Sequence, residues 1–158
     1  GLGDVYKRQL VYQVDYVLDG YVKKAGTNFV LSVGRLIGSQ PELKGEQRLR
    51  KEDIYWEMPR CYQWDITVNL PEGYRISPEG LERLNVKVEN DCGAFIVQAT
   101  TEDGTLRIKA EKRINHKTEP VANWEKLLEI TDAANSYEAL SIVFQATINP
   151  PTSPTTGY

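Results

Sequence analysis

Apolar and polar residues alternate strictly between Tyr62 and Leu70. The stretch reads Tyr-Gln-Trp-Asp-Ile-Thr-Val-Asn-Leu, with a large apolar side chain at every even-numbered position. Successive side chains of a strand point to opposite faces, so the apolar set shares one face of a predicted β-strand over residues 60–70. Pro71-Glu72-Gly73 follows, and these turn-forming residues predict where the strand ends.

The same alternation predicts further strands along the chain. They are expected over residues 11–18, 28–33, 85–89, 93–100, 105–114 and 140–147. Glu102-Asp103-Gly104 is typical of a hairpin turn, so the strands around it are predicted to form a meander. Residues 23–27 are predicted to form a turn, and the glycine-rich segment 34–45 a loop or sheet edge.

Two segments favour helix. Ser77 and Pro78 predict a single helical turn, with Ser77 as the N-cap and Pro78 at the first position. After Pro120, apolar residues recur at helical spacing, and Asn123 or Thr118 is expected to cap that helix. Strands and helices do not alternate as a parallel sheet requires. The predicted fold is therefore mostly β, an antiparallel β-sandwich with one C-terminal amphipathic helix.

The apolar faces also predict the core. The helix after Pro120 is expected to pack its Trp124–Leu127–Leu128 face on the sheet, because so short a helix is marginal alone in water. Eight strand residues are expected in the core: Trp64, Ile66, Val68, Val86, Phe95, Val97, Leu106 and Ile108.

Residues 1–9 are expected to be a non-native leader. Residues 4–9 read Asp-Val-Tyr-Lys-Arg-Gln, which resembles one reading frame of a transposon end used in preparing sequencing libraries. The natural protein is therefore expected to extend further in the N-terminal direction. Residues 10–147 are predicted to form the sandwich domain. The Pro- and Thr-rich residues 148–158 are predicted to form a tail.

Charge excludes some partners. The formal net charge is −3, so no basic surface is available for nucleic acid, which is not expected as a partner. No apolar run approaches the roughly 18 residues of a membrane span.

Reactive side chains are few. His116 is the only histidine, and Cys61 and Cys92 are the only cysteines. A Cys61–Cys92 disulfide and two separate thiols are both compatible with the sequence. Metal sites and Cys–His nucleophiles need several converging groups, which the spacing does not supply. Neither catalytic residues, nor a metal, nor a cofactor is therefore expected.

Aromatic residues offer one alternative to a purely structural role. Nine tyrosines and three tryptophans are compatible with a carbohydrate-binding module, in which outward rings stack on sugars. Most of these rings share parity with aliphatic residues and are expected in the core. Tyr55 and Trp56 are adjacent, so at least one would face outward from a strand. These two are the candidate binding residues.

Several segments resemble the C-terminal β-domain of bacterial transglutaminase-like proteins. They are Val-Asp-Tyr-Val-Leu-Asp-Gly-Tyr at 14–21, the loop carrying Arg48 and Arg50, Ile-Thr-Val-Asn-Leu-Pro-Glu-Gly-Tyr at 66–74, residues 90–95, the strand 106–114 and the helix around Trp124. In that family an N-terminal β-domain, a papain-like Cys-His-Asp core and this domain follow one another, in exported proteins. The family's catalytic residues have no counterpart here.

The resemblance implies a fragment from downstream of an absent catalytic core. It implies a periplasmic or cell-surface location, with the upstream domains of the parent protein as partners. The expected function is a non-catalytic accessory or interaction module, with a carbohydrate-binding module as the alternative. The chain itself is not expected to be an enzyme, although its parent protein would be a transglutaminase-like cysteine enzyme.

Overall fold

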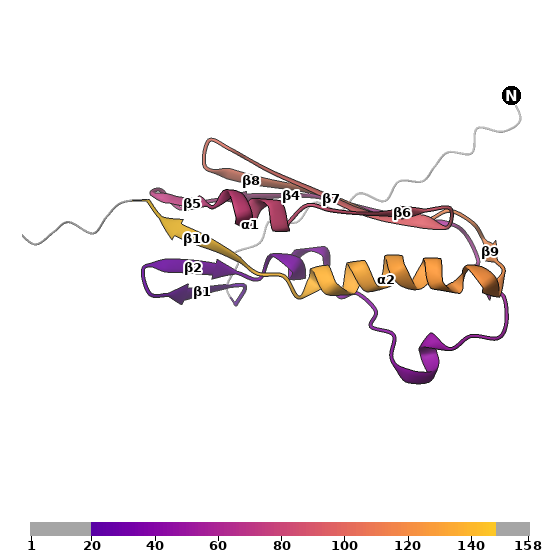
Figure 1. Ribbon diagram of the computed structural model, residues 1–158. Coiled ribbons are helices and arrows are strands. Elements are labelled where there is room, and N and C mark those ends of the chain that lie inside the picture. The colour runs from indigo at the N-terminus through magenta and orange to yellow at the C-terminus, as the bar shows by residue number, and fades with distance from the viewer. Residues whose placement is uncertain (1–19, 148–158) are drawn as a thin grey trace, which may run out of the picture.

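The computed structural model describes residues 20–147, which form two stacked layers (Figure 1). The predicted leader at 1–9, the predicted strand at 11–18 and the predicted tail at 148–158 lie outside the described residues. Within the described range the prediction of a mostly β, antiparallel fold with one C-terminal helix is confirmed.

One layer is a four-stranded antiparallel sheet with the order β4-β8-β7-β6. Its strands are β4 (Arg60–Asn69), β6 (Val86–Asn90), β7 (Gly93–Glu102) and β8 (Thr105–Ile114). The predicted hairpin between β7 and β8 is confirmed. Asp103 and Gly104 both have positive φ, 48° and 74°, which a two-residue type I′ turn requires. The predicted meander is thus present, and β4 is added at its edge.

The second layer combines a smaller sheet with a helix. The smaller sheet, ordered β1-β2-β10-β5, contains β1 (Val22–Ala25), β2 (Asn28–Leu31), β5 (Tyr74–Ile76) and β10 (Ile142–Ala146). Helix α2 (Trp124–Glu138) continues this layer beneath the large sheet (Figure 1). A two-stranded ribbon of β3 (Ile54–Tyr55) and β9 (Thr118–Glu119) lies near the start of α2.

Short helices complete the structure. They are the α-helix α1 (Pro78–Arg83) and the 3₁₀ helices η1 (Val33–Ile37), η2 (Gly45–Arg48) and η3 (Val121–Asn123). No helix within residues 20–147 combines the length and apolar character that crossing a bilayer requires.

Three local predictions need correction. Residues 23–25 belong to β1 rather than to a turn, and the predicted strand 28–33 ends at Leu31. The predicted loop 34–45 contains most of η1. Gly34 is buried there and packs directly against the C-terminal end of α2. A Cβ added at Gly34 would lie 1.9 Å from the carbonyl oxygen of Tyr137. The local sequence carries no sign of this contact, since its partner is about a hundred residues away.

The predicted caps had different outcomes. Ser77 caps α1 as predicted, since its Oγ accepts a hydrogen bond of 3.0 Å from the backbone N–H of Gly80. The predicted capping of α2 by Asn123 or Thr118 is wrong. Asn123 precedes the helix, but its side chain makes no cap bond and donates to Glu119 instead. Thr118 lies earlier, in β9.

The core lies between the large sheet and the second layer. Of the eight predicted core residues, five are buried: Val68, Phe95, Val97, Leu106 and Ile108. Trp64, Ile66 and Val86 are half-buried and pack against that core. The predicted register is therefore correct. Within residues 20–147, β4 and β6 are the outer strands of the sheet, and the second layer covers their inward faces only in part.

Helix α2 packs on β6 and β7 through its apolar face. Leu127 and Leu128 are buried as predicted, Trp124 is half-buried, and Ile130, Ala134 and Tyr137 extend the buried face. The rings of Phe95 and Tyr137 meet edge to face at 5.7 Å between centroids. Burial raises the pKa of Tyr137 to about 12.

Leu128→Asp is expected to unfold the domain. An unpaired buried charge costs several kcal/mol, against a total domain stability of about 5–15 kcal/mol. A thermal melt followed by circular dichroism measures the effect. Ser136→Asp, at an exposed position of the same helix, is the control and should melt like the parent protein. A cooperative Leu128→Asp melt within a few degrees of the parent would contradict the packing.

Phe95→Ala is expected to destabilise the domain more than Trp64→Ala does. Truncating a fully buried aromatic side chain costs about 3–5 kcal/mol, whereas Trp64 keeps part of its surface in water. Urea unfolding of both variants gives the two losses. Equal losses would mean that Trp64 belongs to the closed core.

Candidate functional site: an aromatic cleft with a half-buried lysine

A cleft of about 440 Å³ opens on the inward side of the large sheet. Its floor is formed by β4 and β8, one wall by the segment after η1, and another part by Thr131 of α2. Strands β4 and β8 have 10 residues each, whereas those of the second sheet have three to five. The long strands therefore extend beyond the small sheet, and the cleft lies where the described part of the second layer ends.

Lys112 occupies an inward position on the floor of this cleft. Leu106, Ile108 and Ala110 precede it on the same face of β8 and are buried. Its registered neighbours are Tyr62 on β4 and Phe95 on β7. Its Nζ donates to Gln40 Oε1 at 3.1 Å, and burial lowers the pKa of Lys112. A cation thus stands in the apolar row, hydrogen-bonded to a neutral amide.

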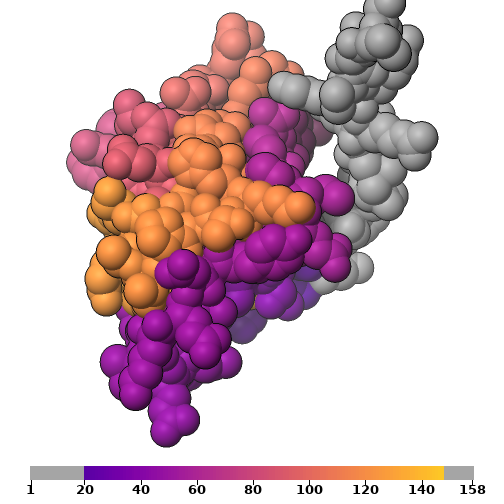
Figure 2. Space-filling view, turned by 90° about the vertical axis from the view of Figure 1, so that its right-hand side faces the viewer, coloured from indigo at the N-terminus to yellow at the C-terminus, as the bar shows by residue number. Residues whose placement is uncertain are grey.

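The wall opposite the sheet is held by polar contacts with α2. The backbone N–H of Gln40 donates to Glu138 Oε2 at 2.6 Å, and Asn135 Nδ2 donates to the Gln40 carbonyl at 3.4 Å. Further along, Arg48 forms two hydrogen bonds of 2.7 and 2.8 Å with Asp132. These contacts fasten the loop to α2. The segment around η2, in purple, lies against α2, in orange, and projects from the body of the domain (Figure 2).

Three aromatic side chains line the cleft: Trp56, Tyr62 and Trp64. Tyr62 and Trp64 stack on each other, with ring centroids 6.1 Å apart and planes inclined by 24°. Tyr62 is 49% exposed. The cleft therefore offers ring surface to a ligand next to the half-buried ammonium of Lys112.

The structure places the two predicted binding residues, Tyr55 and Trp56, in different locations. Trp56 lines the cleft, but Tyr55 is 64% exposed outside it, with the ammonium of Lys117 5.5 Å from its ring centroid. Tyr62, Trp64 and Lys112 were not predicted as site residues. In the sequence, Tyr62 and Trp64 fall on the same strand face as aliphatic residues, and this pattern is typical of core residues. The available signal was Lys112, a charge in an otherwise apolar face of β8.

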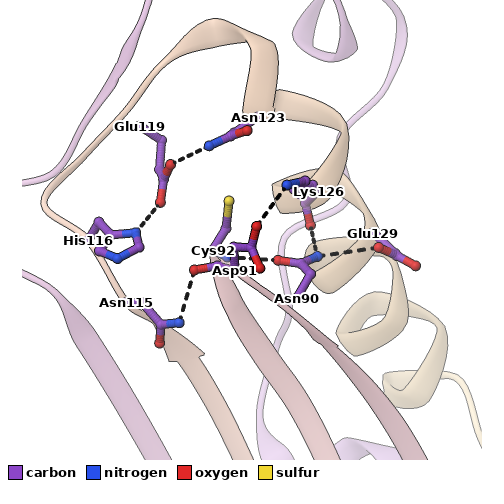
Figure 3. Close-up of polar contacts among 9 residues, drawn as sticks. All are labelled: Asn90, Asp91, Cys92, Asn115, His116, Glu119, Asn123, Lys126 and Glu129. Atoms are coloured by element: carbon purple, nitrogen blue, oxygen red, sulfur yellow. Dashed lines mark hydrogen bonds and ion pairs between the residues drawn. The ribbon is translucent and has the colours of Figure 1, made fainter.

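A second polar cluster surrounds Glu119, which is only 3% exposed. His116 Nδ1 lies 2.5 Å from Glu119 Oε1, and Asn123 Nδ2 donates to Glu119 Oε2 at 2.8 Å. The sulfur of Cys92 points toward the same space (Figure 3). A histidine, a carboxylate and a thiol thus lie together, at the junction of β9 and α2.

The electrostatics of this cluster disfavour a nucleophilic thiolate. Burial raises the pKa of Cys92, and the charge of Glu119 raises it further. Catalytic cysteines need the opposite shift, from a neighbouring cation or a helix N-terminus. Burial also raises the pKa of Glu119, but hydrogen bonds from Asn123 and His116 outweigh it, so the net pKa is lowered. The cluster is suited to holding a buried carboxylate.

The remaining candidate groups lie apart. Cys61 is exposed on β4, where its Sγ lies 3.4 Å from Glu111 Oε1, whereas Cys92 is buried; no disulfide joins the two. Among residues 20–147, no three histidine, cysteine, aspartate or glutamate side chains are grouped closely enough to hold a metal ion.

Glu119→Gln is expected to cost about 1–3 kcal/mol at neutral pH, because the amide nitrogen cannot accept the hydrogen bond that one of the two carboxylate oxygens accepts. The folded-state pKa of Glu119 lies below its ordinary value, so the unfolded chain binds the proton more readily. The parent protein should therefore lose this stability as the pH falls below the ordinary glutamate range.

Denaturant melts between neutral and acidic pH measure both effects. In the Glu119→Gln variant, the free energy of unfolding should fall less on acidification than in the parent protein, because residue 119 no longer takes up a proton. Glu102→Gln, at an exposed position of the β7–β8 turn, is the matched control. Equal acid sensitivity in all three proteins would contradict the role of Glu119.

Comparison with known proteins identifies the family to which the chain belongs. No curated protein and no solved structure matches the chain. Residues 33–144 match DUF3858, which is described as a domain of unknown function with a solved structure. This match carries no information on a transglutaminase-like core or on the origin of residues 1–9. It covers most of the chain, from η1 into β10, and includes every residue of the cleft and of the Glu119 cluster. The chain therefore belongs to the DUF3858 family.

Proposed function

We propose that this domain is a non-catalytic accessory module that binds a protein partner through the segment 49–62. Five large apolar side chains are conspicuously exposed within residues 20–147, and four of them fall in this segment: Leu49, Tyr55, Met58 and Tyr62. Exposed large apolar side chains are typical of interaction sites. Their concentration within the segment 49–62 of the sequence is the observation that supports the proposal.

The proposed partner is the upstream part of the same parent polypeptide. The resemblance of residues 14–21, 66–74 and 106–114 to the C-terminal domain of transglutaminase-like proteins supports this choice. The partner would then be a papain-like Cys-His-Asp core in an exported protein, located in the periplasm or at the cell surface. In this arrangement the catalytic residues belong to the partner, and the module positions or shields it.

The non-catalytic part of the proposal is supported by the Glu119 cluster. Cys92 has a raised pKa, and His116 lies against Glu119 rather than activating the thiol. A thiol with a raised pKa is a poor nucleophile at neutral pH.

A second candidate function is carbohydrate binding, which the cleft favours. Trp56, Tyr62 and Trp64 line it together with polar side chains, and its volume falls within the range of small-molecule sites. Aromatic rings beside polar groups suit the alternating apolar and hydroxyl-bearing surfaces of sugars.

The first function is tested by titrating the domain with the polypeptide encoded directly upstream in its genome. Calorimetry should detect binding, and the double variant Leu49→Ser with Met58→Ser should weaken it at least about tenfold, because exposed apolar anchors dominate such interfaces. Val143→Ser, at the fifth exposed apolar position, is the control and should bind like the parent domain. Absence of binding, or equal loss in the control, would contradict the proposal.

A further inference from the structure

We propose that the cleft binds a sugar acid, with the sugar carboxylate on Lys112 and the sugar ring beside Tyr62 and Trp64. This inference deepens the second candidate function, carbohydrate binding, and rests on it. It adds that the ligand is negatively charged and that Lys112 binds the charged group.

The first argument is the position of Lys112. It stands at an inward site of β8, where Leu106, Ile108 and Ala110 are all buried. A lysine at such a site loses hydration, and an aliphatic residue would pack there at lower cost. Local rules of packing are broken mainly at functional sites. Lys112 is therefore better explained by a ligand than by the fold.

The second argument is the missing counter-charge. An ammonium has three N–H donors, and Lys112 Nζ uses one of them on Gln40 Oε1. None of the described residues that line the cleft is acidic, and Arg60 at the start of β4 adds a second cation. Glu138, near the wall, accepts the backbone N–H of Gln40. The cleft is thus prepared for an anion, and one ammonium with one guanidinium suits a singly charged carboxylate.

The third argument is the character of the remaining lining. Trp56, Tyr62 and Trp64 supply ring surface, and Ser39, Gln40 and Thr131 supply hydroxyl and amide groups. Tyr62 and Trp64 are neighbouring rings with centroids 6.1 Å apart and planes inclined by 24°. Two neighbouring rings span a short surface compared with a polysaccharide chain. A single sugar unit, held at its charged end by Lys112, fits this geometry better.

A peptide ligand would use different groups. An extended peptide gains affinity from backbone hydrogen bonds along an open strand edge. In the described part of the chain the open edges of the large sheet are β4 and β6, whereas Lys112 lies on the inner strand β8. The observations on Lys112 therefore favour a small acidic ring compound.

The test is a titration followed by NMR of the labelled protein, with D-glucuronate and D-glucose as probes. These sugars differ at one carbon, which carries a carboxylate in the first and a hydroxymethyl group in the second. Glucuronate is expected to bind at least about tenfold more tightly, because hydrogen bonds to a charged group are the stronger ones. Its shift changes should centre on Tyr62, Trp64 and Lys112.

Two variants locate the charge recognition. Lys112→Met keeps the length and apolar stem of the side chain, and should weaken glucuronate binding about tenfold or more. Lys109→Met lies on the same strand but on its exposed face, and should change the affinity less than about twofold. Thermal melts of both variants verify that each remains folded.

The outcomes separate this inference from the function on which it rests. Equal binding of glucose and glucuronate, with no effect of Lys112→Met, would overturn the inference and leave carbohydrate binding in place. No shift change with either sugar at millimolar concentration would overturn both. Displacement of the shifts to the β4 edge by an acidic peptide, with no sugar binding, would overturn the inference and support the protein-binding function.

A last arm distinguishes the source of the sugar acid. A galacturonate trimer presents the same carboxylate within a polymer. Binding of the trimer much more tightly than of free glucuronate would indicate an acidic polysaccharide, and comparable binding would indicate a free sugar acid or a terminal unit. Both results support the carboxylate on Lys112. Trimer binding that is insensitive to Lys112→Met would contradict it.

Discussion

The structure depends on covering the inward face of one long sheet with a second layer made of unequal parts. Strands β4, β7 and β8 have 10 residues each, whereas β1, β2, β5 and β10 have three to five. The small sheet therefore covers only part of the apolar face, and α2 covers much of the rest through Leu127, Ile130 and Ala134. The contact of Phe95 with Tyr137 joins the two layers. The tight fit is visible at Gly34, where the end of α2 leaves no room for a side chain.

Two ionisable side chains of the domain lie where the small sheet no longer covers the large one. Lys112 and Glu119 are both ionisable side chains in places where hydrocarbon would be expected, and both are found beyond the small sheet. Their environments differ in one respect. Glu119 is buried and hydrogen-bonded to His116 and Asn123. Among residues 20–147, Lys112 is hydrogen-bonded only to the neutral amide of Gln40, and it lines the cleft. That difference separates a stabilising cluster from the proposed binding site.

Much of the architecture could be predicted from local patterns. The alternation at 62–70, the Asp103-Gly104 turn and the Ser77 cap each specify a short-range geometry, and all three are found. The helix after Pro120 was also predictable, because its apolar spacing is independent of context. What failed depended on distant partners. Gly34 is shaped by α2, and Asn123 is drawn away from its cap by Glu119.

The candidate site was the least predictable part, for a related reason. The alternation of side chains along the strand assigns Tyr62 and Trp64 to the inward face. It cannot show that the described second layer ends before reaching them. Tyr55 and Trp56 were selected by adjacency, which identifies one outward ring and no cleft. The only local sign was the charge of Lys112 within the row 106–114, an exception that gains meaning only once the face is known to be buried.

The wall of the cleft has a consequence for how such domains diversify. The segment between η1 and β3 is a loop fastened to α2 by side-chain contacts, and it contributes nothing to either sheet. Changing the length of a surface loop costs little free energy, since the closure entropy grows only with the logarithm of length. Insertions or deletions there would resize the cleft while the ten-residue strands keep their register. Selection can therefore act on the proposed ligand site almost independently of the thermal stability of the two sheets.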